Sequence, residues 1–138
     1  RWGTDEAIFT KIFALRSPAE LKMIDKCYQN SIGKPLLKAV ENEFHGDTKE
    51  LLLTVINNAI DPSALFAKKI YDSVHGLGTN DKRLIRSVIY RLEKDIPEVK
   101  QKFDALSKKK NMVEYIKSDL SGDYKALMIG IINKDLNK

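Results

Sequence analysis

The feature that most constrains the fold of this 138-residue chain is an internal repeat. The letters WGT at residues 2–4 align with LGT at residues 77–79, an offset of 75 that becomes 76 in the later part of the unit. The aligned positions include Phe13 with Val88, Leu21 with Ile96, Val40 with Ile116, Gly46 with Gly122, and Leu52 with Met128. A register this long is typical of two copies of one structural unit.

The two copies are not of equal length. The change of offset places one extra residue in the second copy, near Lys108–Lys110. The second copy also has residues 63–74 before its GT turn, whereas their counterpart would lie before Arg1. We therefore interpret residues 1–60 as a unit that lacks its first helix, and residues 61–138 as a complete unit.

Apolar residues recur with helical spacing and nowhere alternate as in a strand. The stripe of Leu51, Leu52, Val55 and Ile56 is repeated at 127–132. We expect helices at 5–15, 18–29, 34–44, 47–59, 62–74, 80–92, 96–107, 111–119 and 122–133. Helices this short are not stable alone, so the sequence predicts an all-α fold in which five helices of each complete unit form a bundle.

Local signals support these helix starts. Ser17 and Glu20 have the spacing of a capping box, and so do Asn111 and Glu114. Arg16 and Arg91 occupy equivalent positions, and we expect both to form structural hydrogen bonds.

The stretch VHGLGTND at residues 74–81 joins two expected helices. Gly76 and Gly78 allow positive φ and leave neighbouring backbone carbonyls without a Cβ beside them. Calcium prefers six to eight oxygen ligands, and backbone carbonyls are suitable ligands. About 40 residues beyond each GT turn lies an acid, Glu43 or Asp119, at an expected helix end and three residues before a glycine.

The paired loop, acid and helical repeat resemble the annexin family, whose five-helix repeats carry a GxGT loop and an acidic residue about 40 positions later. The resemblance covers essentially the whole chain. The first copy is similar to the third annexin repeat without its first helix, and the second copy is similar to the fourth. The resemblance implies the C-terminal half of an annexin core, with its repeats in a right-handed superhelical bundle of about nine helices.

The resemblance also implies a ligand set. In the second copy, the carbonyl groups of Val74, Gly76 and Gly78 and the carboxylate of Asp119 are expected to hold Ca²⁺. Glu43 matches the acidic ligand of the first copy, whose carbonyl positions would precede Arg1. Trp2 and Leu77 match loop-tip residues that contact membranes.

The net charge of +5 favours anionic partners, and no apolar run is long enough to span a bilayer. The single cysteine, Cys27, cannot form an internal disulfide, which suits a reducing compartment such as the cytoplasm. We expect calcium-dependent, peripheral binding to acidic phospholipid membranes. The alternative is a calcium-independent helical-repeat scaffold or polyanion-binding module.

We do not expect an enzyme, because Cys27, His45 and His75 form no recognisable nucleophile–base pattern. Nucleic acid is not an expected partner. Apolar surface left uncovered by absent helices is expected to favour either self-association or binding of the N-terminal half of the core.

Overall fold

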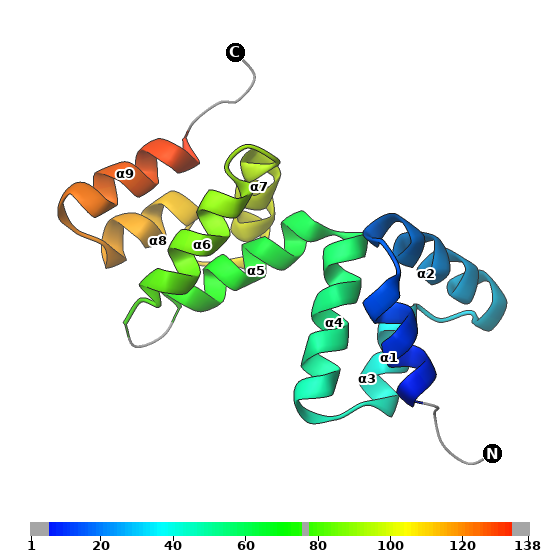
Figure 1. The fold of residues 1–138 in the computed structure, drawn as a ribbon. Coiled ribbons are helices and arrows are strands. Elements are labelled where there is room, and N and C mark those ends of the chain that lie inside the picture. Colours follow the sequence, from blue (N-terminus) through cyan, green and yellow to red (C-terminus); the bar gives the residue numbers. More distant parts are fainter. Residues whose placement is uncertain (1–5, 76–77, 134–138) are drawn as a thin grey trace. The chain divides into compact units, whose positions relative to one another are not determined.

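The computed structural model describes residues 6–75 and 78–133. These residues form nine α-helices and no strand, which confirms the all-α prediction. The helices are α1 (Glu6–Leu15), α2 (Pro18–Ile32), α3 (Leu36–Glu43), α4 (Gly46–Ile60), α5 (Pro62–Val74), α6 (Asp81–Arg91), α7 (Ile96–Leu106), α8 (Met112–Asp119) and α9 (Gly122–Ile132) (Figure 1).

The chain divides into two compact units, one ending at Pro62 and the other beginning at Ser63. The first unit contains α1–α4, and the second contains α5–α9 apart from Pro62 (Figure 1). Below, each unit is described by itself.

Each unit has its own buried core, and seven paired positions of the repeat are buried in both. In the first unit the core consists of Phe13, Leu21, Leu36, Val40, Phe44, Leu52, Ile56 and Ala59. In the second unit it consists of Ala67, Ile70, Val74, Leu84, Val88, Ile96, Val99, Phe103, Met112, Ile116, Leu120, Met128 and Ile132. The apolar stripes of the sequence are therefore the faces that the helices bury.

Two helix boundaries in the first unit differ from the expected ones by more than one residue. Helix α2 continues to Ile32 because Gly33 adopts a left-handed conformation (φ 74°) and donates its N–H to the carbonyl oxygen of Gln29 at 2.8 Å. Helix α3 begins only at Leu36, after Pro35 in an extended conformation. A residue that precedes proline is disfavoured in the α region, which excludes Lys34 from the helix.

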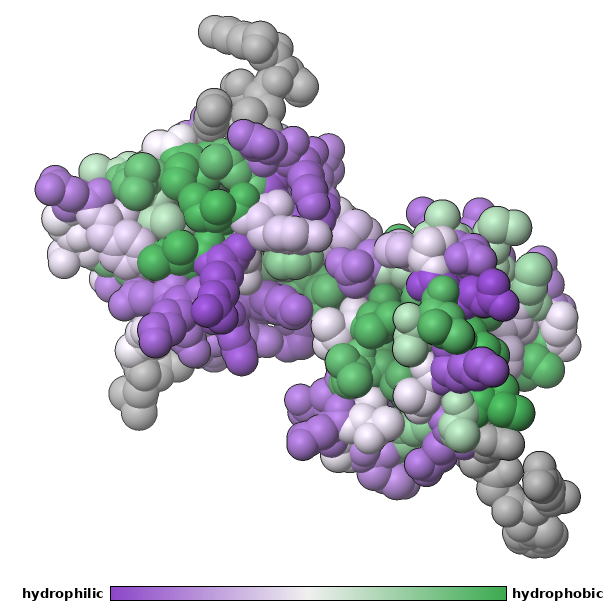
Figure 2. Space-filling model, in the orientation of Figure 1, coloured by the Kyte–Doolittle hydropathy of each residue, from purple (hydrophilic) through white to green (hydrophobic). Residues whose placement is uncertain are grey.

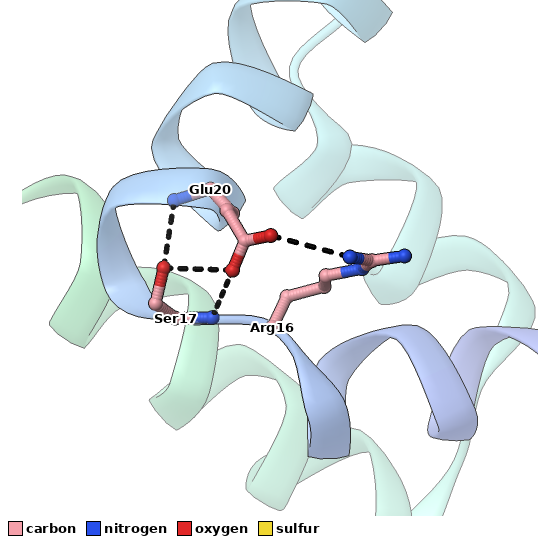
Figure 3. A network of polar contacts seen from close by, with 3 residues as sticks. All are labelled: Arg16, Ser17 and Glu20. Atoms are coloured by element: carbon pink, nitrogen blue, oxygen red, sulfur yellow. Dashed lines mark hydrogen bonds and ion pairs between the residues drawn. The ribbon is translucent and has the colours of Figure 1, made fainter.

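The predicted capping boxes are confirmed. The hydroxyl of Ser17 accepts from the Glu20 N–H, and the Ser17 N–H donates to Glu20 Oε2 at 2.8 Å (Figure 3). Glu20 also pairs with exposed Arg16 at 3.2 Å. The Ser17 backbone N–H, the Ser17 hydroxyl and Arg16 together lower the pKa of the Glu20 carboxyl. Asn111 and Glu114 form the same box at α8.

The loops that follow the two predicted acids have the same backbone conformation. Gly46 and Gly122 have φ of 57° and 56°. The residues before them are extended, with φ and ψ of −135° and 164° at His45 and of −136° and 168° at Ser121. The repeat therefore extends to the geometry of the loops.

Replacing Gly122 with alanine is expected to lower the free energy of unfolding by about 1 kcal/mol, because a non-glycine residue at positive φ is strained. A Cβ at Gly122 would meet no atom within 4 Å, so the cost is conformational. Gly130, inside α9, is the matched control, and Gly130→Ala should raise stability by up to about 1 kcal/mol. Urea denaturation followed by circular dichroism measures both, and effects of the same sign would contradict this explanation.

Apolar side chains also remain on the surface of each unit (Figure 2). Leu51 and Leu127, at paired positions of the repeat, are 63% and 61% exposed, and the paired Leu15 and Tyr90 are also exposed. Within the described ranges, every helix is too short or too polar to cross a bilayer.

Candidate functional site

The loop between α5 and α6 is held at its base by the backbone. The Asn80 N–H donates to the carbonyl oxygen of Ser73 at 2.8 Å, which closes the loop. The Asn80 side chain then accepts from the Arg83 N–H at 3.1 Å and caps α6. Ser73 is buried, and its hydroxyl donates to the Ile70 carbonyl oxygen at 2.6 Å. Both ends of the loop are thus attached to ordered helices.

Two of the predicted loop residues are described. Val74 is buried and is the last residue of α5, where carbonyl groups have no donor from their own helix. Gly78 has φ of 82°, as its role in a tight turn requires. Gly76 and Leu77 lie outside the described residues.

The structure brings Gly78 and Asp119 together. Asp119 is the exposed last residue of α8, and it lines a surface hollow of about 460 Å³. Gly78 lines the same hollow, together with Thr79, Asp81, Leu120, Ser121 and Tyr124. Residues about 40 positions apart in the sequence therefore meet at one place on the second unit.

The chemistry of this hollow suits a hard cation. All the polar side chains that line it end in oxygen, namely those of Thr79, Asp81, Asp119, Ser121 and Tyr124. Oxygen donors without sulfur or imidazole favour calcium or magnesium over softer metals.

The Tyr124 hydroxyl is an unsatisfied group in this hollow. Its oxygen is shielded from solvent and has no hydrogen-bond partner of normal geometry among the described residues. Burial, followed by the nearby Asp81 carboxylate, raises the pKa of Tyr124. Buried polar groups normally have a partner, and the Asp81 carboxylate lies close enough to act on the Tyr124 hydroxyl.

A metal held here would need more than acidic side chains. Among residues 6–75 and 78–133, no three His, Cys, Asp or Glu side chains lie close enough to bind one ion. Backbone carbonyls and water would therefore supply most ligands, which is the kind of ligand set that the loop can offer.

For the first unit, the described residues include only part of this arrangement. Glu43 is the exposed last residue of α3, in the position that Asp119 has in α8. Trp2 lies outside the described residues, as does the rest of its GT turn. The structure therefore describes the acidic side of this unit alone.

Sequence reasoning did not assign Asp81 or Tyr124 to the site. A signal for Asp81 was present, because Glu6 is its counterpart in the first copy and an acid therefore occurs in both. Tyr124 has no such signal, since its position belongs to the apolar stripe of α9.

Comparison with known proteins gives consistent results. The family model Annexin matches residues 1–55 and 65–131. The chain is 37% identical over 133 residues to human annexin A13 and 36% identical over 134 residues to human annexin A7, covering 96% and 97% of this chain but only 42% and 27% of those proteins. It thus spans less than half the length of these relatives.

Solved structures with the same fold include annexin III, with a TM-score of 0.86 at 32% identity over 98% of this chain and 42% of that one. A calcium-bound annexin named (Sm)1 has a TM-score of 0.87 at 32% identity, over 94% of this chain and 37% of that one. With the family model matching both units, the loop, the acid and the repeated helices all have one explanation: this chain belongs to the annexin family.

Proposed function

We propose that this chain binds calcium at the loop of its second unit and thereby attaches to acidic phospholipid membranes. Members of the family bind calcium and phospholipid membranes. The observation that carries the proposal is the oxygen-lined hollow shared by Gly78 and Asp119. We propose a binding protein rather than an enzyme.

The proposed ligands are the carbonyl oxygens of Val74, Gly76 and Gly78 and the carboxylate of Asp119. This set supplies one negative charge and about four oxygens, whereas calcium takes six to eight oxygens and carries two charges. The ion can therefore accept a lipid phosphate, which brings both oxygen and negative charge. Because each partner improves binding of the other, calcium and lipid affinities are linked.

Other residues are proposed to support attachment. Leu77 and Trp2 are proposed as membrane contacts at the loop tips, and tryptophan is favoured in the interfacial region of a bilayer. Glu43 is proposed as the acidic ligand of the first unit. The association is peripheral, on the cytoplasmic side.

Co-sedimentation with vesicles tests this function. The chain should pellet with phosphatidylserine-containing vesicles in millimolar calcium, and should stay in solution in EGTA or with vesicles of phosphatidylcholine alone. Pelleting that persists unchanged in EGTA would contradict the proposal.

The net charge of +5 supports a second candidate, a calcium-independent polyanion-binding scaffold. Calorimetry separates the two. Heat on calcium addition favours the first function, whereas salt-sensitive heparin binding with no heat at millimolar calcium favours the second.

The expected partners other than membranes stay predictions. The exposed apolar residues at paired positions, Leu15 with Tyr90 and Leu51 with Leu127, are suited to pack against further units of the same kind. Such units could come from an N-terminal half of the core or from a second copy of the chain.

A further inference from the structure

The segment that carries the extra residue of the second copy, Lys108–Lys110, connects α7 to α8. It is held by Ser107, which is buried and whose hydroxyl donates to the Lys110 carbonyl oxygen at 2.6 Å. The backbone of Lys110 therefore has a defined position just before the capping residue Asn111.

The side chain of Lys110 runs along α8 toward the opposite end of that helix. Its Nζ lies 5.7 Å from the centre of the Tyr115 ring, within cation–π range, and donates to Ser118 Oγ at 3.3 Å. The ammonium group thus lies beside the residue that precedes Asp119.

Ser118 joins this ammonium group to the predicted calcium ligand. Its hydroxyl lies 3.1 Å from Asp119 Oδ1 and 2.9 Å from the Tyr115 carbonyl oxygen, and its single proton can be donated to either. The Lys110 ammonium and the Asp119 carboxylate therefore both lie within hydrogen-bonding distance of the same hydroxyl group.

Among the described residues of the first unit, no lysine contact equivalent to that of Lys110 is seen at Lys34. With the offset of 76 that applies after the extra residue, the paired residues are Lys34, Asn42 and Glu43. Within the described ranges, Lys34 has no hydrogen-bond or ion-pair partner. The contact is therefore a property of the second unit and not a general consequence of the repeat.

We propose that Lys110 makes calcium binding at the candidate site depend more strongly on an anionic headgroup. This inference rests on the proposed function. A positive charge near Asp119 repels a divalent cation and so weakens calcium binding in solution. The same charge attracts an anionic phosphate or carboxylate that approaches the ion. Lys110 is thus proposed as a positioning residue, which acts through its hydrogen bond to Ser118 and through the electrostatic effect of its ammonium charge.

Lys110 therefore weakens calcium binding without lipid and strengthens the contribution of the membrane. A purely structural role would not change these two quantities in opposite directions. Lys110→Met in the full chain should tighten calcium binding without lipid by about two- to fivefold, as measured by calorimetric titration with CaCl₂. The ratio of the calcium affinity with phosphatidylserine vesicles to the calcium affinity without them should fall by a similar factor. Ser118→Ala should change both in the same directions, by less.

Lys109→Met is the matched control, because Lys109 is an exposed lysine of the same segment, whereas the contacts with Ser118 and Tyr115 are made by Lys110. Lys110→Met and Lys109→Met with indistinguishable values in both titrations would overturn the inference while leaving the proposed function intact. An unaltered chain that binds no calcium would overturn both. Unchanged thermal unfolding of each variant shows that the comparison is made on folded protein.

Discussion

Asp119→Asn is expected to raise the calcium concentration needed for half-maximal vesicle binding at least tenfold. The proposed ligand set contains one carboxylate, so this substitution removes all of its side-chain charge while keeping an oxygen and the shape of the residue. A tenfold loss corresponds to about 1.4 kcal/mol, a modest amount for a ligand bond to a divalent ion.

The substitution should leave the fold intact. Asp119 is exposed at the end of α8, where a negative charge is unfavourable to the helix dipole, so its loss does not cost stability by itself. Its one hydrogen-bonding neighbour among the described side chains is Ser118, at 3.1 Å, with which an asparagine oxygen can also bond. A weakened membrane attachment would therefore report on calcium and not on unfolding.

Asp123→Asn provides the control. Asp123 is exposed four residues farther on, in the first turn of α9, and it does not line the hollow. Vesicle co-sedimentation over a calcium series should show a shift for Asp119→Asn and almost none for Asp123→Asn. Equal shifts for the two variants would mean that surface charge alone matters, and the assignment of Asp119 as a ligand would fail.

The second large effect concerns stability. Arg91→Ala is expected to lower the free energy of unfolding by about 3 kcal/mol, because removing one partner of a buried ion pair leaves the other charge unpaired. The guanidinium of Arg91 makes a two-pronged contact with the Asp95 carboxylate, and the two side chains are only 8% and 18% exposed. Arg91 also lies over the rings of Phe66 at 5.1 Å and Tyr90 at 5.8 Å.

The repeat provides an internal control for this prediction. Arg16 occupies the equivalent position in the first unit, but it is exposed and pairs with exposed Glu20. Exposed ion pairs contribute about 0–1 kcal/mol, so Arg16→Ala should have a small effect. Arg91→Lys keeps the charge but loses the planar fork, and an intermediate loss is expected. Chemical denaturation measures all three, and similar losses for Arg16→Ala and Arg91→Ala would refute the explanation by burial.

The sequence by itself determined the helices, the repeat and the main core positions. These depend on interactions within a few residues or on the spacing of apolar side chains, as in the capping boxes of Ser17 and Asn111 and the paired core residues Val40 and Ile116. The GT turn and the acid could also be located in the sequence, because Gly78, Thr79 and Asp119 have the counterparts Gly3, Thr4 and Glu43.

Only the tertiary structure decided which chemistry surrounds those positions. Arg16 and Arg91 share a register, yet only Arg91 is buried, because burial depends on neighbouring elements such as the Phe66 ring of α5. Tyr124 reaches the hollow, and Lys110 reaches Ser118 across the length of α8, through side-chain directions that spacing in the sequence does not specify. Local patterns determine secondary structure, whereas contacts between distant side chains depend on how the helices pack.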